Sequence, residues 1–498
     1  MLSSENRTDQ EKTILGHPPG LFLLFFTEMW ERFSFYGMRA LLIFYLTKHF
    51  LFSDNKSYTI YAAYTSLIYI MPVIGGFIAD KILGGRKAVL YGAVLITIGH
   101  FLMGFEGNGG NQAFAINCFY IALAFIIVGT GFLKGNISAI VGSLYNKDDL
   151  RRDPAFTIFY MGINLGGALG PLICGYIGER YGWRYGFGLA GVGMAIGLAI
   201  FIFCRPLLKG RGESAYPEKL SQKIMGISKE NWTYILGLVG IVFSALLLNY
   251  HEVVGQLLGV IGILLVGYIL YCAFQLPSVA RDRLLAAMLL MIGSVIFWSL
   301  FEQAGSSLNM FTDRYTDRHI AGIDIATSMF QSLNSIYIIL LAPLMAGFWT
   351  LLNKYKLEPS SFFKFGMGLI GLGIGFLVLV AGAPAHSNQL MPVIFIFLIY
   401  FFHTLGELCL SPVGLAAITR LSPMHMAGLM VGTWFFSTAF GEYGAGMIAQ
   451  MTSSGGGDGF HTILNVYSSI GWLSVVFGGG IFILTPFLKR LLHENEGE

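Results

Sequence analysis

The chain has 498 residues, of which 55% are hydrophobic and 12% are charged, and its mean hydropathy is +0.66. Soluble domains carry about 25% charged residues, so this composition excludes an ordinary soluble protein and indicates a membrane protein with many spans. The net charge of +3 gives no reason to expect a nucleic-acid partner. The five cysteines have neither metal-binding nor redox spacing and are interpreted as small buried apolar residues.

Runs of about 20 apolar residues predict membrane-spanning helices. The first run follows a polar segment that lacks the basic-then-apolar pattern of a cleavable signal, so we expect it to be a permanent span. The longest runs are expected to tilt in the bilayer. In chain order, the fourteen predicted spans cover residues 21–48, 57–83, 87–106, 113–145, 154–180, 183–204, 232–250, 253–274, 282–312, 326–352, 362–382, 390–420, 424–452 and 463–488.

The basic residues predict the orientation of these spans. An even number of spans places both termini on the same side of the membrane. Of the 31 Lys and Arg residues, 22 fall on the side of the termini, six on the other side and three within spans. Because cytoplasmic loops carry an excess of Lys and Arg, this asymmetry predicts that both termini are cytoplasmic.

The spacing of the spans divides the chain into three parts. Residues 205–231 form the longest polar stretch between spans and are interpreted as a cytoplasmic linker. The two spans that follow it carry almost no charge. We therefore expect an N-terminal six-helix bundle at 1–205, the linker with a two-helix hairpin at 206–280, and a C-terminal six-helix bundle at 281–498.

The first span contains four charged residues, Glu28, Glu31, Arg32 and Arg39. A charge at the centre of a bilayer costs about 2.5–3.5 kcal/mol even on insertion scales, so these side chains need partners or water. Their spacing, which also includes Phe35, places them on one face of a helix. A charged stripe on an otherwise apolar span indicates an ion or proton pathway.

Three further charged residues lie within spans: Lys134 in the fourth, and Glu302 and Glu407 in the first and fourth spans of the C-terminal bundle. We expect all of these charges to meet in one central cavity. The alternative is a set of static ion pairs that hold the bundle together, but apolar packing would do this at a lower desolvation cost.

The expected lining of this cavity indicates its ligand. Arg and Lys side chains suit a carboxylate, whereas Glu407 beside the amide of Asn334 suits an ammonium group. Such a cavity fits a zwitterion, for example a short peptide. Aromatic residues expected in its walls, with lipid contact or core packing as the alternative for each, are Tyr36, Tyr69, Trp298, Trp434 and Phe435.

The loop after the second span has the form G-x-x-x-D-[RK]-x-x-G-x-[RK]-[RK]. Its glycines allow a tight turn, and its acid can pair with a basic residue or a helix end. We interpret it as a gating loop, with a simple turn as the alternative. Its motif residues are Gly76, Asp80, Lys81, Gly84, Arg86 and Lys87.

Other chemistry is not indicated. There is no phosphate-binding loop and no G-x-S-x-G nucleophile motif, which argues against a pump and a lipase. His403 precedes Glu407 by one helical turn, but no third ligand is in view, so no metal site is expected.

Taken with these features, the chain resembles the proton-dependent oligopeptide transporter (POT or PTR2) family of the major facilitator superfamily. The resemblance runs from about residue 17 to residue 490, and the central hairpin is similar to that of the bacterial members. The matching motifs are E-x-x-E-R-F at Glu28, Glu31, Arg32 and Phe33; F-Y-x-x-I-N-x-G at Phe159, Tyr160, Ile163, Asn164 and Gly166; F-W-x-x-x-E-Q ending at Gln303; F-Q-x-L-N ending at Asn334; and G-E-L-x-L-S-P ending at Pro412.

The resemblance implies an all-α major facilitator fold with two six-helix bundles and an inserted hairpin. It also implies a symporter, not an enzyme, that imports di- and tripeptides by alternating access. Protons are the implied coupling ion, with no other cofactor. The implied setting is the lipid bilayer of the bacterial inner membrane, and we expect a functional monomer.

Individual roles follow from the same resemblance. Arg39 and Lys134 are expected to contact the peptide carboxylate and to exchange ion-pair partners with Glu302. The residues implied in proton coupling are Glu28, Glu31, Arg32 and Glu302.

The remaining implied roles concern the peptide. Asn334 and Glu407 are expected to hold its amino terminus, and Asn164 its backbone. The residues expected to line the pocket are Tyr36, Tyr69, Trp298, Ser411, Trp434 and Phe435.

Two positions depart from the family pattern. Phe35 replaces a tyrosine usual after E-R-F-x, and Glu442 stands where a small polar residue such as Asn is usual. Both leave specificity open. Two other functions also stay open: a symporter for nitrate, an amino acid or another small solute, and a non-transporting receptor or membrane enzyme.

Overall fold

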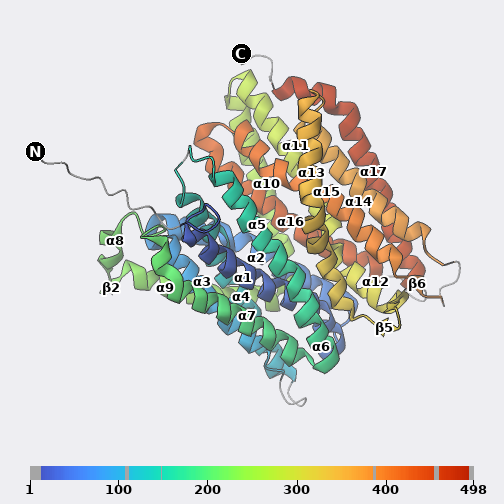
Figure 1. Cartoon of the computed structure of the whole chain (residues 1–498), viewed down its shortest axis with the longest axis horizontal. Coiled ribbons are helices and arrows are strands. Elements are labelled where there is room, and N and C mark those ends of the chain that lie inside the picture. The colour runs from blue at the N-terminus through green and yellow to red at the C-terminus, as the bar shows by residue number, and fades with distance from the viewer. Residues whose placement is uncertain (1–12, 107–111, 147, 385–388, 454–458, 493–498) are drawn as a thin grey trace, which may run out of the picture.

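The computed structural model describes residues 13–106, 112–146, 148–384, 389–453 and 459–492. Long helices packed side by side make up most of it, and two-residue strands lie in the loops (Figure 1). Arg7, Lys12 and Lys147, which were counted in the orientation prediction, lie outside the described residues.

The first six predicted spans form the helices α1 to α7. Proline at the start of α1 is favourable because the first N–H groups of a helix have no partner within it. A π-helical turn at Pro171–Gly175 divides the fifth span into α5 and α6. The helices are α1 (Pro19–Phe44), α2 (Asp54–Ile78), α3 (Gly85–Met103), α4 (Gln112–Ser143), α5 (Arg152–Gly170), α6 (Tyr176–Tyr181) and α7 (Trp183–Cys204).

The polar segment after α7 forms a short helix and an antiparallel strand pair, and the predicted hairpin follows it directly. The side chain of Ser228 accepts a hydrogen bond from the backbone N–H of Asn231 and so caps the first hairpin helix. The elements are α8 (Pro217–Ser221), β1 (Lys223–Ile224), β2 (Ile227–Ser228), α9 (Lys229–Asn249) and α10 (His251–Gln275).

The last six predicted spans form α11 to α17. Strand β4 pairs antiparallel with β5, and β3 pairs parallel with β6. The elements are α11 (Ser278–Phe301), α12 (Ser307–Tyr315), β3 (Thr316–Asp317), β4 (His319–Ile320), β5 (Ile323–Asp324), α13 (Ser332–Lys354), α14 (Ser361–Ala381), β6 (Met391–Pro392), α15 (Ile394–Leu421), α16 (Ala427–Ser453) and α17 (Gly459–Leu492).

A 3₁₀ turn interrupts another predicted span, the ninth. The segment predicted as a single helix at 282–312 runs from Ser278 to Tyr315, but a 3₁₀ turn at Glu302–Gly305 separates α11 from α12. Gly305 and the serines at 306 and 307 favour such a break, because glycine and serine are weaker helix formers than the apolar residues before them.

The span count is consistent with fourteen. Within the described residues, twelve helices are long and apolar enough to cross a membrane. The other two predicted spans correspond to α1 and α16, which are 26 and 27 residues long. Helix α1 carries the charged stripe, which makes it more polar than an ordinary span.

The helices pack in two groups. Helix α1 packs against α5 and α7, and α3 against α4, whereas α14 packs against α15 and α17, and α11 against α16. The two groups, called here the N-half and the C-half, meet where α2 packs on α16 and where α5 packs on α13. The hairpin helices lie against α4 and α2. The boundaries at 205 and 280 stay predictions.

The long helices run between two opposite sides of the molecule, and the side that carries the chain ends is called the termini side (Figure 1). Helix α1 starts on the termini side and α2 returns to it, so the loop at Gly84 lies there with the linker (Figure 1). The opposite side, called the far side, carries α12 and the strands β3 to β6 (Figure 1).

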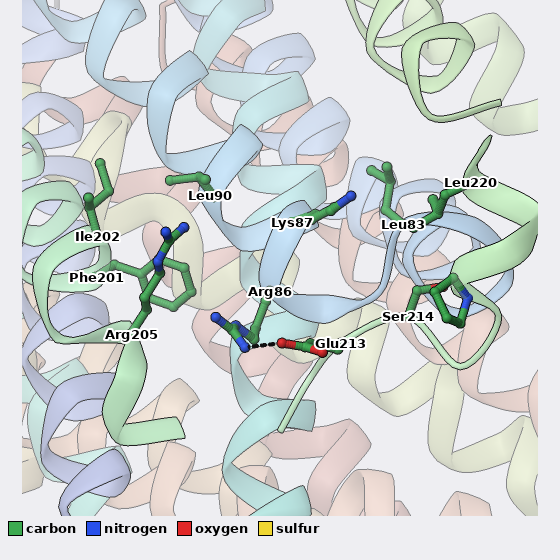
Figure 2. A pocket seen from close by; sticks show the side chains of 11 residues that line it. Leu83, Arg86, Lys87, Leu90, Phe201, Ile202, Arg205, Glu213, Ser214 and Leu220 are labelled. Carbon is green, nitrogen blue, oxygen red and sulfur yellow. Dashed lines mark hydrogen bonds and ion pairs between the residues drawn. The ribbon is translucent and has the colours of Figure 1, made fainter. Parts of the chain in front are cut away.

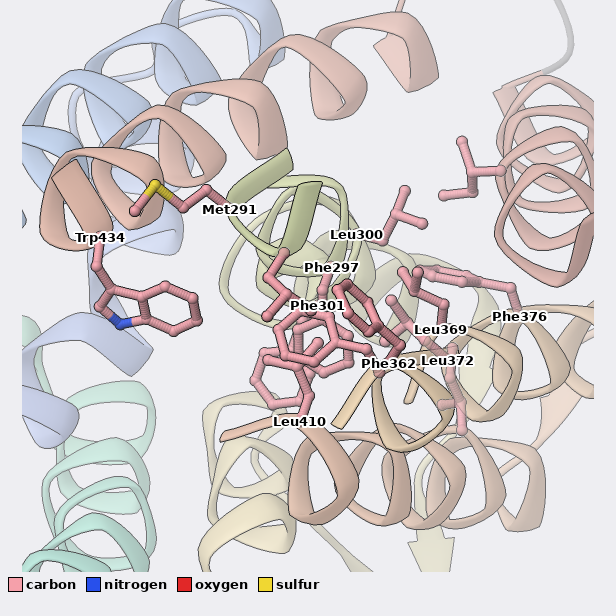
Figure 3. Packing of buried hydrophobic residues seen from close by; sticks show 14 of the residues in the cluster. Met291, Phe297, Leu300, Phe301, Phe362, Leu369, Leu372, Phe376, Leu410 and Trp434 are labelled. Atoms are coloured by element: carbon pink, nitrogen blue, oxygen red, sulfur yellow. The ribbon is translucent and has the colours of Figure 1, made fainter. Parts of the chain in front are cut away.

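An aromatic core holds α11 in the C-half. Phe297 and Phe301 stack with ring centroids 5.5 Å apart, and Phe362 and Phe376 belong to the same buried cluster (Figure 3). Close packing of this kind leaves little freedom for side-chain movement. Glu302 directly follows Phe301 in the chain, so this packed cluster holds the backbone from which the Glu302 side chain extends.

Glycines permit the close approach of α5 to α1. A Cβ atom added at Gly166 would overlap the carbonyl oxygen of Met29 and would lie 2.9 Å from the Cβ of Arg32. The position of the charged stripe thus depends on the absence of a side chain at residue 166.

We expect Gly166→Ala to destabilise the protein, because the new methyl group overlaps backbone atoms of α1, and overpacking of a tight contact costs about 1–3 kcal/mol. The apparent melting temperature of the purified protein in detergent measures this. Gly347→Ala in α13 is the control, since nothing lies within 4 Å of a Cβ there. Equal melting temperatures for both variants would contradict the packing argument.

Candidate functional site

The charged stripe of α1 is buried inside the N-half. Glu28, Glu31 and Arg32 are 3%, 0% and 3% exposed. The Nε atom of Arg32 lies 3.2 Å from Oε1 of Glu28 and also forms an ion pair with Oε2 of Glu31. Two carboxylates therefore share one guanidinium group.

Several polar atoms of this cluster lack a hydrogen-bond partner among the described residues. Oε2 of Glu28, Oε1 of Glu31 and Nη2 of Arg32 are buried and have no hydrogen-bond partner among the described residues. An excess carboxylate in a site shielded from solvent is costly when charged. The arrangement is chemically suited to accept a proton.

A second buried ion pair joins the two halves. Nη2 of Arg39 on α1 pairs with Oε2 of Glu302, and the two residues are 6% and 4% exposed. Nε of Arg39 also donates a hydrogen bond to the hydroxyl of Tyr61 on α2, at 2.7 Å. Tyr61 was not predicted as a site residue, although its place in a span rich in tyrosines gave a weak signal.

The far side of the molecule is held together by further contacts between the halves. The carboxylate of Glu179 accepts hydrogen bonds from the backbone N–H groups of Thr327 and Ser328, at 3.2 and 2.7 Å. The ion pairs there are Lys48–Asp313 at 2.8 Å, Arg314–Asp54 at 2.5 Å and Arg180–Asp324 at 3.2 Å.

Lys134 lies near this centre without an ion pair to any described residue. It is half-buried on α4, and its Nζ lies 4.0 Å from the centroid of the Tyr69 ring. The ring of Tyr36 lies 5.9 Å from Cζ of Arg39. Of the two expected partners of Glu302, the structure therefore pairs Arg39 with it and places Lys134 against an aromatic face.

The C-half carries a polar cluster of its own around Glu407. Nδ2 of Asn334 on α13 donates hydrogen bonds to Oε2 of Glu407 at 2.8 Å and to Oγ1 of Thr404 at 3.2 Å, both on α15. Thr404 was not predicted as a site residue, although its position three residues before Glu407 places it on the same helix face.

The expected wall residues fall into two groups. Trp298 and Phe435 are half-buried, whereas Trp434 is buried against Gly414, where any Cβ would overlap its ring. Nε1 of Trp298 and Oγ of Ser411 are buried without a hydrogen-bond partner among the described residues. The hydrogen-bonding capacity of these two polar atoms is therefore unused by the described residues.

Asn164 and Glu442 are two further polar residues within spans. Nδ2 of Asn164 donates to the carbonyl of Tyr160 one turn earlier, at 3.0 Å, so this amide is engaged by its own helix. Glu442 on α16 is 2% exposed, and neither of its carboxylate oxygens has a hydrogen-bond partner within the part of the chain that is described.

The loop after α2 contacts the linker. Gly84 has φ +78°, a backbone conformation that favours glycine. Nη1 of Arg86 pairs with Glu213 at 2.5 Å, and Nζ of Lys87 pairs with Glu230 at 2.6 Å.

The other motif residues of this loop have no such anchor. Asp80 and Lys81 are exposed and form no hydrogen bond or ion pair with a described residue, and Gly76 borders open space. The structure thus connects the basic end of the motif to the linker, and it does not connect the motif to the C-half among the residues described.

Comparisons with known proteins agree with this architecture. The sequence model of the POT family (PTR2) matches residues 86–467. The peptide transporter YePEPT of Yersinia enterocolitica is 34% identical, over 100% of this chain and 99% of that protein. Dipeptide and tripeptide permease A of Proteus mirabilis is 33% identical, over 99% of each chain.

Solved structures support the same relationship. The crystal structure of a mutant of the peptide transporter POT in complex with alafosfalin is similar over 97% of both chains, with a TM-score of 0.84 and 34% identity. The all-helical architecture, the full-length relatives and the family match agree. The chain is therefore a multi-pass membrane protein with the major facilitator fold, and it belongs to the POT family of transporters rather than to any class of enzyme.

Proposed function

We propose that the protein is a proton-coupled symporter that imports di- and tripeptides by alternating access. The observation that carries the proposal is the buried Arg39–Glu302 pair, which joins the two halves within the membrane-spanning segments. This pair must break when the halves separate. The charge on Glu302 therefore affects how easily the halves move apart. The names of the peptide-transporting relatives support the substrate class.

The N-half and the C-half of the molecule contribute opposite charges to the site. Arg39 and Lys134 lie in the N-half, and Glu407 with Asn334 lies in the C-half. A short peptide carries a carboxylate at one end and an ammonium group at the other. We assign the cations to the carboxylate and Glu407 to the amino terminus, with Trp298 and Ser411 as donors to the peptide backbone.

Protonation of Glu302 starts the cycle. A neutral carboxyl no longer holds Arg39 by charge, so the guanidinium is released to bind the peptide carboxylate. Movement of the halves around a neutral carboxyl and a paired arginine is less costly than burial of a bare charge. The cluster of Glu28, Glu31 and Arg32 supplies a second place for the proton, and no other cofactor is required.

Orientation follows from the charge asymmetry of the loops. With cytoplasmic termini in the bacterial inner membrane, the far-side contacts such as Lys48–Asp313 face outward and close the outer entrance. The described structure then corresponds to a conformation closed to the outside. All proposed site residues come from one chain, so a monomer in the bilayer suffices.

We expect Glu302→Gln to abolish proton-driven accumulation of labelled dialanine in proteoliposomes while counterflow exchange continues. A proton gradient of one pH unit is worth about 1.4 kcal/mol, which supports about tenfold accumulation for one proton per peptide. The variant should stay near onefold, because Gln cannot exchange a proton. Glu252→Gln, an exposed acid on α10, should behave as wild type. Full pH-driven accumulation by Glu302→Gln would refute the assigned role.

We expect Glu407→Gln to weaken the binding of dialanine by about tenfold or more, since a hydrogen bond to a charged group contributes about 1.5–3 kcal/mol. N-acetyl-dialanine, which has no ammonium group, should bind the variant and the wild type equally. Competition uptake assays with both compounds measure this. An equal loss for both compounds would contradict an ammonium site at Glu407, and uptake insensitive to dialanine would favour another solute.

A further inference from the structure

A pocket unrelated to the central site opens on the termini side of the N-half. It has a volume of about 260 Å³ and lies between the start of α3, the end of α7 and the linker (Figure 2). The residues that line it are Leu83, Arg86, Lys87, Leu90, Phe201, Ile202, Arg205, Glu213, Ser214, Pro217 and Leu220.

The pocket carries an excess of positive charge. Its lining includes three cationic side chains, Arg86, Lys87 and Arg205, and one carboxylate, Glu213. Arg86 is paired with Glu213, and Lys87 with Glu230 of α9. Arg205 forms no hydrogen bond or ion pair with a described residue, and Figure 2 shows it beside Phe201, apart from the Arg86–Glu213 pair.

The opposite wall of the pocket is apolar and lies deeper in the span. Leu90 follows Arg86 by four residues on α3, and Phe201 precedes Arg205 by four residues near the end of α7. Four residues of helix correspond to about 6 Å along the axis. Ile202 beside them is 39% exposed. Cations thus lie at the ends of two spans, with an accessible apolar surface about one turn further in.

We propose that this pocket binds the phosphate of an anionic phospholipid. The phosphate lies between Arg205 and Arg86, and an acyl chain follows the surface of Leu90 and Ile202. Phosphate oxygens suit guanidinium groups, and basic pockets between spans are typical sites for anionic headgroups. Free inorganic phosphate shares this chemistry, but the apolar wall beside the cations favours the lipid.

The bound headgroup affects the linker as well. Glu213 forms an ion pair with Arg86 in the described structure. The lipid phosphate and the Glu213 carboxylate therefore compete for the same guanidinium group. Glu213 belongs to the linker that connects the two halves, next to Ser214, whose hydroxyl donates to the carbonyl of Ile82 at 2.8 Å. Lipid binding therefore weakens one of the contacts that hold the linker to the N-half.

Native mass spectrometry of the full chain, loaded with an equimolar mixture of phosphatidylglycerol and phosphatidylcholine, tests the proposal. Wild type should retain phosphatidylglycerol preferentially. Arg205→Gln should retain about fivefold less, the effect of one cation near a membrane surface, whereas Glu213→Gln should retain more. Lys354→Gln, which removes an exposed cation at the end of α13 outside the pocket, is the matched control and should behave as wild type.

Equal retention of the two lipids by wild type, or the same loss in Arg205→Gln and Lys354→Gln, would overturn the proposal. An excess of inorganic phosphate that displaces phosphatidylglycerol completely would also overturn it and would assign the pocket to a free anion. Circular dichroism of Arg205→Gln and its dialanine uptake should match wild type, which separates a lost lipid site from misfolding.

Discussion

The cost of ionised side chains inside a membrane constrains the whole structure, because each buried charge needs an opposite charge, water or a change of protonation to offset it. Arg39 and Glu302 come from different halves, and neither half could bury its own member of the pair without a large penalty. Their association is therefore a reason for the halves to meet within the membrane-spanning segments. Aromatic packing at Phe297 and glycine contacts at Gly166 hold the helices that present these charges.

The acids and bases near the centre do not balance. The acids Glu28, Glu31, Glu302, Glu407 and Glu442 outnumber the bases Arg32, Arg39 and Lys134. The surplus of carboxylates is larger than the motif residues alone suggest, because Glu442 adds a buried acid with no hydrogen-bond partner among the described residues. A surplus of this kind fits a site whose charge is adjusted by protons as the halves move.

Much of the fold was predictable, because long apolar runs and the few charged residues within them are strong signals that depend only on the local sequence. The spans, the charged face of α1 and the proximity of Asn334 to Glu407 follow from spacing and from the family motifs. The choice of Arg39 over Lys134 as the partner of Glu302 depends on the crossing of α1, α2 and α11, which no local pattern encodes. The amide of Asn164 bonds to the carbonyl of Tyr160 in its own helix, and the motif that contains Asn164 does not tell this local bond from a contact with a ligand.

The 3₁₀ turn at Glu302–Gly305 makes α12 a short, separate arm. Its nine residues span about 13 Å. The turn that precedes the arm carries Glu302, which pairs with Arg39, and near the other end of the arm are Asp313 and Arg314, which pair with Lys48 and Asp54 on the far side. A single turn and one short helix therefore join the buried ion pair between the halves to two ion pairs of the far side, so these contacts between the halves are linked through one continuous segment of the chain.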